Sequence, residues 1–210
     1  MTSTKVIIRE AQSEDAQGVL NYLKFITNET SNLLLTPEEM AQKKLTDEIN
    51  LLEESSKSSE NLFLLATKDE KIIGTANMKS FLRKRISHRG TFGISVLKEF
   101  SDQGIGSMLL AEIINYAKSI NLEILELEVR TDNIPAIHLY KKFGFKEYGL
   151  YENFFKIDHK YYDGDTYVIS FKLEIIIQKE HHRVLAVMLF LLYLNYYENN
   201  FNSTYFEVSR

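Results

Sequence analysis

The segment Glu123–Arg130 constrains the fold of this chain most, because apolar and charged residues alternate along it. Its two kinds of side chain fall on opposite faces of an extended chain, Leu125, Leu127 and Val129 on one and Glu126, Glu128 and Arg130 on the other. Such a half-buried strand needs neighbouring strands and a layer packed on its apolar face. A helix is predicted to follow, with Pro135 in its first turn and Gly144 as its left-handed end. This order predicts a mixed α/β domain.

Other strands are predicted where short runs of apolar and β-branched residues lie between turn residues. They cover Val6–Arg9, Leu62–Thr67, Lys71–Ser80 and Thr91–Leu97, and then a final hairpin of Glu147–Ile157 and Thr166–Leu173 around Asp163-Gly164-Asp165. Arg83–Arg89 is expected to be a basic connector between two of these strands.

Three more helix signals lie between these strands. Ser13 caps a helix of about fifteen residues. Pro37 opens a second helix that runs past Ile49 and gives way to a polar loop at Glu53–Asn61. Gly104 opens a third, whose apolar residues, including Leu109 and Ile113, recur at helical spacing.

Composition limits the chemistry that the domain can perform. The 210 residues include no Cys and carry a net charge of −4. The absence of Cys excludes thiol nucleophiles, Cys-ligated zinc and iron–sulfur clusters. His181 and His182 are adjacent and do not share a helix face, so no metal site is predicted. The mild acidity argues against nucleic acid as a partner, since phosphates require a basic surface.

The domain is expected to span residues 1–173, because the composition changes beyond Leu173. Residues 174–210 form a predicted extension that holds the apolar run Val184–Leu194, whose eleven residues are too few to span a bilayer. A helix that is apolar all round must bury against its own domain, a partner subunit or a membrane interface, and we favour contact within a homodimer. Met1–Arg9 lacks the apolar core of a signal peptide, so a cytoplasmic location is expected.

The glycine-containing segment between a strand and a helix is a potential anion site. It comprises Ser101, Asp102, Gln103, Gly104, Ile105, Gly106 and Ser107. Successive backbone N–H groups at a helix start attract phosphate, and the two glycines would let the backbone approach a pyrophosphate. Taken alone, the segment also fits an ordinary strand-to-helix turn. Leu109 stands where a dinucleotide fingerprint needs a third glycine, and the Lys of a Walker loop is absent.

A second motif, about thirty residues later, gives the glycine segment a context. It runs from Leu127 to Phe145 and contains Asn133, Ala136, Leu139, Tyr140, Gly144 and Phe145 in the pattern Asn-x-x-Ala-x-x-Leu-Tyr-x-x-x-Gly-Phe. With Gln103-Gly104-Ile105-Gly106, this motif resembles the GNAT family of acyl-CoA-dependent N-acyltransferases over Val6–Leu173. The resemblance implies a central mixed, mostly antiparallel sheet flanked by helices, with acetyl-CoA bound across two splayed strands.

The resemblance also implies which residues bind acetyl-CoA. The segment 101–107 would take the pyrophosphate, although Ser101 replaces the Arg or Gln usual in the family and Asp102 adds an acid. Ile94 and Val96 would offer main-chain groups to the pantetheine arm and the thioester, with Asn133 and Ala136 beside the same arm. Read from the sequence alone, the first two also fit a strand core and Asn133 a helix cap.

Two catalytic residues are implied by the same resemblance. Tyr140 would donate its proton to the departing thiolate, although it also fits a core aromatic position. Glu128, twelve positions earlier, matches a glutamate that acts as general base in family members that acetylate protein N-termini. A bystander Glu128 would instead pair with Arg130 on a solvated face. Other family members use a glutamate on the fourth strand as the base, but Thr91 occupies that position here. Weaker candidates for the base are His88, Glu29 and Glu39.

The resulting hypothesis is an N-acetyltransferase in which a primary amine attacks the thioester directly within a ternary complex. The N–H of Val96 would stabilise the oxyanion. The acceptor is a small-molecule amine or a protein N-terminus, and the loops expected to meet it, Phe25–Pro37, Lys79–Gly90 and Asp158–Asp165, carry no motif that decides between them. The alternative is a catalytically weak acyl-CoA-binding or scaffold module.

Overall fold

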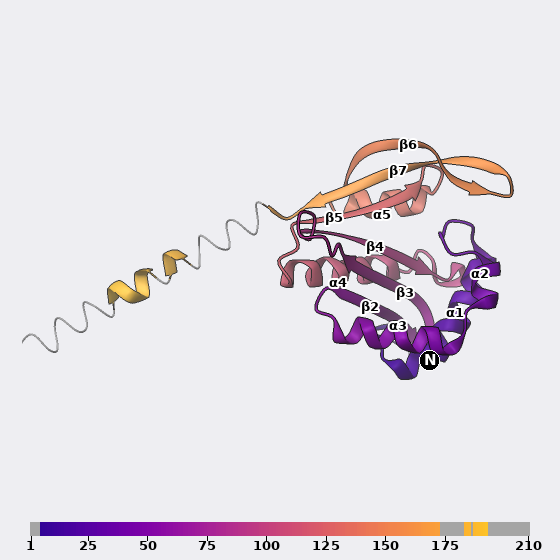
Figure 1. Ribbon diagram of the computed structural model, residues 1–210, viewed down its shortest axis with the longest axis horizontal. Coiled ribbons are helices and arrows are strands. Elements are labelled where there is room, and N and C mark those ends of the chain that lie inside the picture. Colours follow the sequence, from indigo (N-terminus) through magenta and orange to yellow (C-terminus); the bar gives the residue numbers. More distant parts are fainter. Residues whose placement is uncertain (1–4, 173–182, 186, 193–210) are drawn as a thin grey trace, which may run out of the picture. The chain divides into compact units, whose positions relative to one another are not determined.

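The computed structural model describes residues 5–172, 183–185 and 187–192, and the chain divides into two compact units, 1–170 and 171–210. Figure 1 shows the elements of the first unit. Its strands are β1 Ile7–Glu10, β2 Asn61–Lys68, β3 Lys71–Ser80, β4 Arg89–Val96, β5 Ile124–Arg130, β6 Lys146–Ile157 and β7 Lys160–Ser170. Its helices are α1 Ala16–Glu29, α2 Pro37–Gln42, α3 Leu45–Lys57, α4 Ile105–Ser119 and α5 Ile134–Lys142, with short 3-10 turns at Ser13–Asp15 and Lys98–Phe100.

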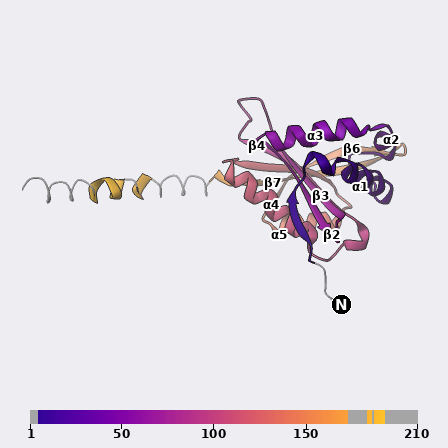
Figure 2. The same ribbon diagram turned by 90° about the horizontal axis from the view of Figure 1, so that it is seen from below.

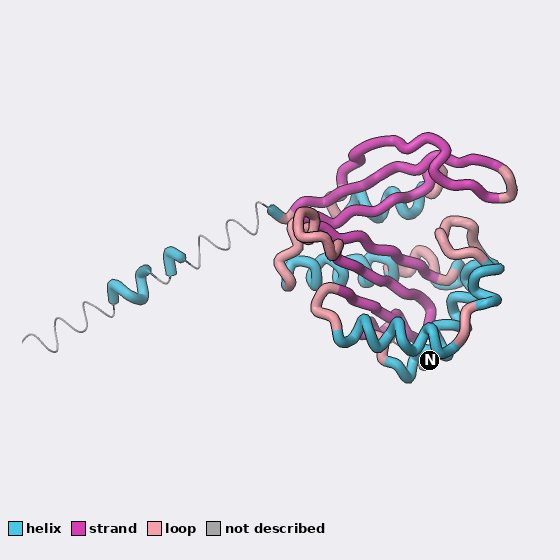
Figure 3. The backbone as a smooth tube through the Cα atoms, in the orientation of Figure 1, coloured by secondary structure: helices cyan, strands magenta, loops and turns pink. Residues whose placement is uncertain are grey.

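The strands form one seven-stranded sheet in the order β1-β2-β3-β4-β5-β7-β6. Every neighbouring pair is antiparallel except β4 and β5, which run parallel. Helices α1 to α3 cover one face of the sheet, and α4 and α5 cover the other (Figure 2; Figure 3 shows the same layers by element type). The predicted mixed α/β class with a mostly antiparallel sheet is therefore confirmed.

The core has two layers because each sheet face meets its own helices. On the first face, Val19 and Ile26 of α1 are buried with Leu52 of α3 and Leu65 of β2. On the second face, α4 approaches β3 at Gly74, where an added Cβ would lie 3.3 Å from a methyl of Leu109. Leu109 is fully buried, so truncation to Ala would cost about 2–5 kcal/mol.

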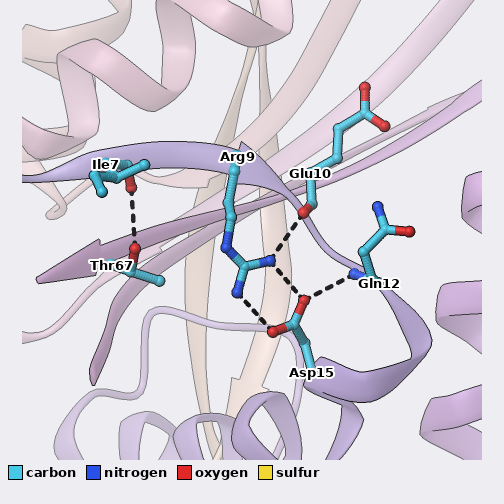
Figure 4. Close-up of polar contacts among 6 residues, drawn as sticks. All are labelled: Ile7, Arg9, Glu10, Gln12, Asp15 and Thr67. Atoms are coloured by element: carbon cyan, nitrogen blue, oxygen red, sulfur yellow. Dashed lines mark hydrogen bonds and ion pairs between the residues drawn. The ribbon is translucent and has the colours of Figure 1, made fainter. Parts of the chain in front are cut away.

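An ion pair fixes the short edge strand β1 to the first turn that precedes α1 (Figure 4). The two carboxylate oxygens of Asp15 each accept a 2.6 Å hydrogen bond from the Arg9 guanidinium. Asp15 Oδ2 also accepts the backbone N–H of Gln12 at 2.8 Å. The hydrogen bonds from Arg9 lower the pKa of Asp15, so the pair stays ionised at neutral pH.

The predicted turn of the last hairpin is wrong. The chain reverses at Asp158 and His159, whose φ angles are 47° and 64°, and Asp163–Asp165 lies inside β7. Gly164 is a residue of this strand, and glycine suits the position because a Cβ there would meet side chains of Phe154 and Phe155 at 3.1 Å. The Asp-Gly signal therefore marks close packing, while residues without a glycine among them adopt the left-handed turn.

Two helix predictions also need correction. The second predicted helix is two helices, since Lys43 and Lys44 are extended with ψ angles of 126° and 153°. The segment predicted as a loop from Glu53 is helical to Lys57, and an ion pair of 2.9 Å between Glu53 and Lys57 supports this last turn.

The second unit is described only in part. Residues 183–185 and 187–192 are helical, and the apolar side chains among them are exposed. Within the described residues, no helix is both long enough and apolar enough to cross a membrane. The predicted domain boundary at 173/174 stays a prediction, because that position and most of the extension lie outside the described residues.

Candidate functional site

The central feature of the sheet is an opening between β4 and β5. These strands pair only at Arg89 with Ile124, Gly90 with Leu125 and Thr91 with Glu126. Beyond Thr91, β4 stays paired with β3 as far as Val96, whereas β5 stays paired with β7 as far as Arg130. The two halves of the sheet therefore separate, and a gap opens toward the carboxyl ends of both strands.

Backbone polar groups line both edges of this gap. The N–H of Leu97 donates to Ile73 O at 3.0 Å, so the odd-numbered residues of β4 bond to β3. The backbone groups of Ile94 and Val96 consequently face the gap. On β5, Thr131 N donates to Asp163 O at 3.1 Å, so by the same alternation the backbone groups of Glu128 face the gap from the other side.

The start of α4 supplies a second set of unpaired donors. Gly104 caps this helix with φ 80°, and the first backbone bond of the helix is Met108 N to Gly104 O at 3.0 Å. Among the described residues, no acceptor is found for the N–H groups of Ile105, Gly106 and Ser107. A Cβ at Gly104 would meet nothing within 4 Å, so the residue that caps the helix is not crowded by neighbouring atoms. This arrangement favours an anion.

The side chains around these donors differ from the expectation in two ways. A Cβ at Gly106 would lie 3.2 Å from a methyl of Leu139, so the small residue there serves the packing of α4 on α5. Lys142, at the end of α5, places its Nζ 3.5 Å from Ser107 Oγ and brings a cation to the anion site. Sequence reasoning missed Lys142, because only the packing of two helices brings it there. Ser101, Asp102 and Gln103 are exposed.

Tyr140 is buried within an aromatic cluster on the α5 side of the sheet. Its ring centroid lies 5.9 Å from those of Phe92 and Phe145 and 6.4 Å from that of Tyr167. Burial raises the pKa of Tyr140 to about 12. No hydrogen bond to its hydroxyl is found among the described residues, so the protonated hydroxyl has no protein acceptor there.

Glu128 lies on the opposite face of β5 at the edge of the gap. Tyr167 pairs with Leu127, so Tyr140 is on the Leu127 face and the side chain of Glu128 points the other way. Glu128 is an exposed residue whose carboxylate is partly desolvated by its neighbours. This desolvation and then the charge of Glu126 raise the pKa of Glu128, against a hydrogen bond from its own backbone N–H. No ion pair to Glu128 is found in the described part of the chain, because Arg130 binds Asp132 instead.

The weaker candidates for the base occupy other places. The backbone O of His88 accepts hydrogen bonds from Glu123 and Ile124, at the end of the sheet where β4 and β5 are still paired. Glu29 accepts the backbone N–H of Lys98 at 2.8 Å, and Glu39 caps α2 through Thr36 N at 2.8 Å. The carboxylates of Glu29 and Glu39 therefore have structural partners, and His88 lies at the closed end of the sheet.

Two of the three loops expected to meet the acceptor frame the gap. Residues 30–36 join α1 to α2, and Ser31 contacts Arg130 at the end of β5. The tip of the β6–β7 hairpin extends past the last pair of β5 and β7, Arg130 with Gly164. The loop within Lys79–Gly90 lies at the end of the sheet where β4 and β5 are paired, away from the gap, so its predicted place beside the acceptor stays a prediction.

Asn133 and Ala136 begin α5 beside the end of β5. The Asn133 side-chain oxygen accepts the N–H of Ala136 at 3.4 Å, so Asn133 has the capping role that the sequence also allowed. The gap edge and the α4 donors thus offer main-chain groups, with Lys142 as a nearby cation, that suit an extended ligand ending in phosphates. No cluster of three His, Cys, Asp or Glu residues that could hold a metal ion occurs in the described ranges.

Comparison with known sequences decides the family. The family model described as Acetyltransferase (GNAT) family matches residues 27–145, which is more than half of the chain. The chain belongs to the GNAT acetyltransferase family. Members of this family take the acetyl group from acetyl-CoA, so this GNAT protein is an acetyl-CoA-dependent N-acetyltransferase.

Individual relatives of this GNAT protein are named for different acetyl acceptors. L-amino acid N-acetyltransferase AaaT from Escherichia coli (strain K12) is 27% identical over 165 residues, covering 77% of this chain and 95% of the relative. An N-alpha-acetyltransferase from Sulfurisphaera tokodaii is 34% identical over 128 residues, covering 56% and 72%. A GNAT acetyltransferase structure from Streptococcus pneumoniae matches with TM-score 0.76 and 30% identity, over 79% of this chain and 99% of that one.

Proposed function

We propose that this GNAT protein transfers the acetyl group to a primary amine by direct attack within a ternary complex. The observation that carries the proposal is the gap between β4 and β5, with the unpaired donors of α4 at the same end of the sheet. Acetyl-CoA supplies the activated acetyl thioester. Its extended arm would lie along Ile94 and Val96, and its phosphates would meet the N–H groups of 105–107 with Lys142 nearby.

The main-chain groups at the gap would also act on the reaction. The N–H of Val96 faces the opening, where it can donate to the oxygen that gains negative charge as the amine attacks. A donor of this kind is typically worth about 3 kcal/mol. Cys is absent from the sequence, so no thiol is present to form a covalent acetyl-enzyme.

The faces of β5 divide the acid and base roles. Tyr140 on one face would donate a hydrogen bond as charge develops on the leaving sulfur. Its pKa of about 12 keeps it protonated across the working pH range. Glu128 on the other face would accept the amine proton, and its raised pKa makes it a stronger base than a carboxylate of ordinary pKa. The gap between β4 and β5 connects the two faces.

We propose that the acceptor is a free amino acid or a protein N-terminus. AaaT is named for amino acids and the Sulfurisphaera protein for Nα groups, and both acceptors present a primary α-amine. Because the α1–α2 loop and the β6–β7 hairpin frame the Glu128 side of the gap, either acceptor would enter there.

Release of free thiol from acetyl-CoA tests the proposal. Wild-type protein is incubated with free L-amino acids and, separately, with a short peptide that begins with alanine. Mass spectrometry checks for a gain of one acetyl group on the α-amine. The Tyr140→Phe variant is the matched control. Thiol release without an acetylated acceptor, or no release from any amine, contradicts the proposal.

A binding or scaffold module is the second candidate, favoured by the exposed Ser101 and Asp102 at the anion site. An acid beside the phosphates would weaken acetyl-CoA binding. Thiol release separates the two, because both would show heat of acyl-CoA binding in calorimetry and only the enzyme would release free thiol with an amine.

We also propose that the extension from residue 174 serves assembly, as a contact within a homodimer. The support is that the apolar side chains of residues 184, 185 and 187–192 are exposed. Exposure of so many apolar side chains to water is unfavourable, and a second copy of the chain could cover them. Most of the apolar run lies in the described residues, and the rest of the extension lies outside them. The cytoplasmic location stays a prediction.

A further inference from the structure

Arg130 is a buried arginine whose hydrogen-bonding groups are distributed over three segments. Its side chain is only 9% exposed. Nε and Nη2 donate to the two oxygens of Asp132 at 2.9 and 2.5 Å. Nη1 donates to Ser31 Oγ at 3.0 Å and reaches Ser31 O at 3.5 Å. The guanidinium also lies 4.1 Å from the ring centroid of Tyr162. The alternating pattern predicted a solvated side chain here, so this burial is unexpected.

These contacts cross the gap on the Glu128 side. Ser31 belongs to the loop after α1, and α1 is held to the β4 half of the sheet by a 2.9 Å hydrogen bond between Tyr22 and Ser95. Arg130 belongs to β5, in the other half. On the far side of the sheet, the rings of Phe92 and Tyr140 make a contact across the same opening. Arg130 therefore joins the two halves where the acceptor is expected to enter.

The chemistry of the contact requires arginine. A planar guanidinium can bind a carboxylate through two donors, reach a third acceptor and stack on a ring at once. A lysine at 130 could keep the charge opposite Asp132, but its single ammonium group would not hold Ser31 and Tyr162 in the same geometry.

We propose that Arg130 is a positioning residue for the acetyl acceptor. By holding Ser31 and Tyr162 against its own side chain, two residues from Glu128 on the same face of β5, it fixes the walls that an amino acid or peptide meets, without touching the reacting atoms. This inference rests on the proposed function, in which the amine approaches from the Glu128 side. It predicts that loss of the contact weakens acceptor binding and spares acetyl-CoA binding.

Hydrogen exchange tests the holding step without any need for activity. Arg130→Lys should raise amide exchange in residues 30–36 relative to wild type, because the loop loses its anchor on β5. Ser31→Ala is the milder variant, which keeps the ion pair of Arg130 with Asp132 and removes only the contact at Oγ. Arg9→Ala is the matched control, since it breaks an arginine–aspartate pair at the distant edge strand β1 and should leave exchange in 30–36 unchanged.

Steady-state kinetics then tests positioning, with the alanine peptide or L-amino acid that the wild-type protein acetylates. Arg130→Lys should raise the acceptor KM by about 10-fold or more, the scale of a lost charged hydrogen bond, while the acetyl-CoA KM stays within about twofold. Ser31→Ala should show a smaller shift in the same direction, and Arg9→Ala none.

Four outcomes are informative, and between them they overturn three different claims. Unchanged exchange in 30–36 in both variants overturns the holding role. Faster exchange with an unchanged acceptor KM, or an equal rise in both KM values, overturns the positioning role. A wild-type protein that acetylates neither acceptor contradicts the proposed function instead, and the exchange data still decide whether Arg130 holds the loop.

Discussion

Replacing Tyr140 by phenylalanine removes one hydroxyl and keeps a ring that contacts Phe92, Phe145 and Tyr167. If that hydroxyl assists the leaving thiolate, turnover should fall by about 10²- to 10⁴-fold with little change in acetyl-CoA affinity. The same change should not destabilise the fold, because no hydrogen bond of the hydroxyl is found within the described residues. Tyr140→Phe is therefore expected to lower turnover without lowering the stability of the fold.

The expected stability change follows from the surroundings of this hydroxyl. Among the described residues, the hydroxyl oxygen of Tyr140 is not one of the fully buried side-chain atoms without a hydrogen-bond partner, so water can reach it. Its deletion should therefore leave the free energy of unfolding within about 0.5 kcal/mol of wild type, a change in Tm of at most about 2 °C. Thermal unfolding followed by circular dichroism measures the shift.

Tyr22 provides the matched control for stability. It is equally buried, at 5% exposed against 8% for Tyr140, but its hydroxyl bonds to Ser95 Oγ at 2.9 Å. Tyr22→Phe should therefore lower the free energy of unfolding by about 1 kcal/mol. The two substitutions delete the same atom, and only Tyr22→Phe is expected to lower Tm.

Alkaline pH gives an independent readout of Tyr140. Its pKa is raised from an ordinary 10 to about 12, so the folded state favours the neutral phenol. The contribution to stability is complete below pH 10 and is lost as the pH rises through 12, to the extent of about 2–3 kcal/mol. Tyr140→Phe should lack this part of the alkaline decline. A variant that keeps the wild-type rate, or that loses more than about 1 kcal/mol at neutral pH, would refute the reasoning.

Three further predictions concern the base, the anion site and the extension. Glu128→Gln should remove the acid limb of the pH–rate profile. In the wild-type protein this limb should lie above the ordinary carboxyl pKa, because the pKa of Glu128 is raised. Measurements with two amines of different pKa show whether the limb instead follows the substrate. Ser101→Arg should tighten CoA binding up to about fivefold in calorimetry, as expected for an exposed charge pair, and an unchanged affinity would contradict the place given to the phosphates. Removal of residues 174–210 should change the oligomeric state from dimer to monomer in light scattering, whereas an unchanged oligomeric state with lost acetyl-CoA binding would assign the extension to the catalytic domain.

Local signals predicted most of the fold. Alternation in Glu123–Arg130 identified a strand, and Gly104 and Gly144 marked helix ends where φ is 80° and 87°. The same local logic failed at the last hairpin, because Asp158 and His159 take left-handed angles without a glycine. It also missed the break at Lys43 and Lys44, where no residue typical of helix ends marks the extended backbone.

The candidate site was harder to predict, because its main contacts join residues far apart in the chain. The family motif directed attention to Ile94, Val96 and Tyr140, which lie at or beside the gap. The sequence placed Arg130 on a solvated face, yet it is buried against Ser31, 99 positions away. Lys142 reaches Ser107 only because α4 and α5 pack together. No local pattern encodes either contact.

The gap between β4 and β5 also has a thermodynamic consequence. The hydrogen bonds between β4 and β5 end after three residue pairs, so the facing edges of the two strands have unpaired main-chain groups beyond that point. A ligand that lies along the edge completes the sheet and binds only the folded state. Folding and occupancy are then linked by mass action: a ligand at 100 times its Kd adds about 2.7 kcal/mol to the free energy of unfolding. The lifetime of this protein under heat or proteolysis would therefore follow the supply of its own cosubstrate.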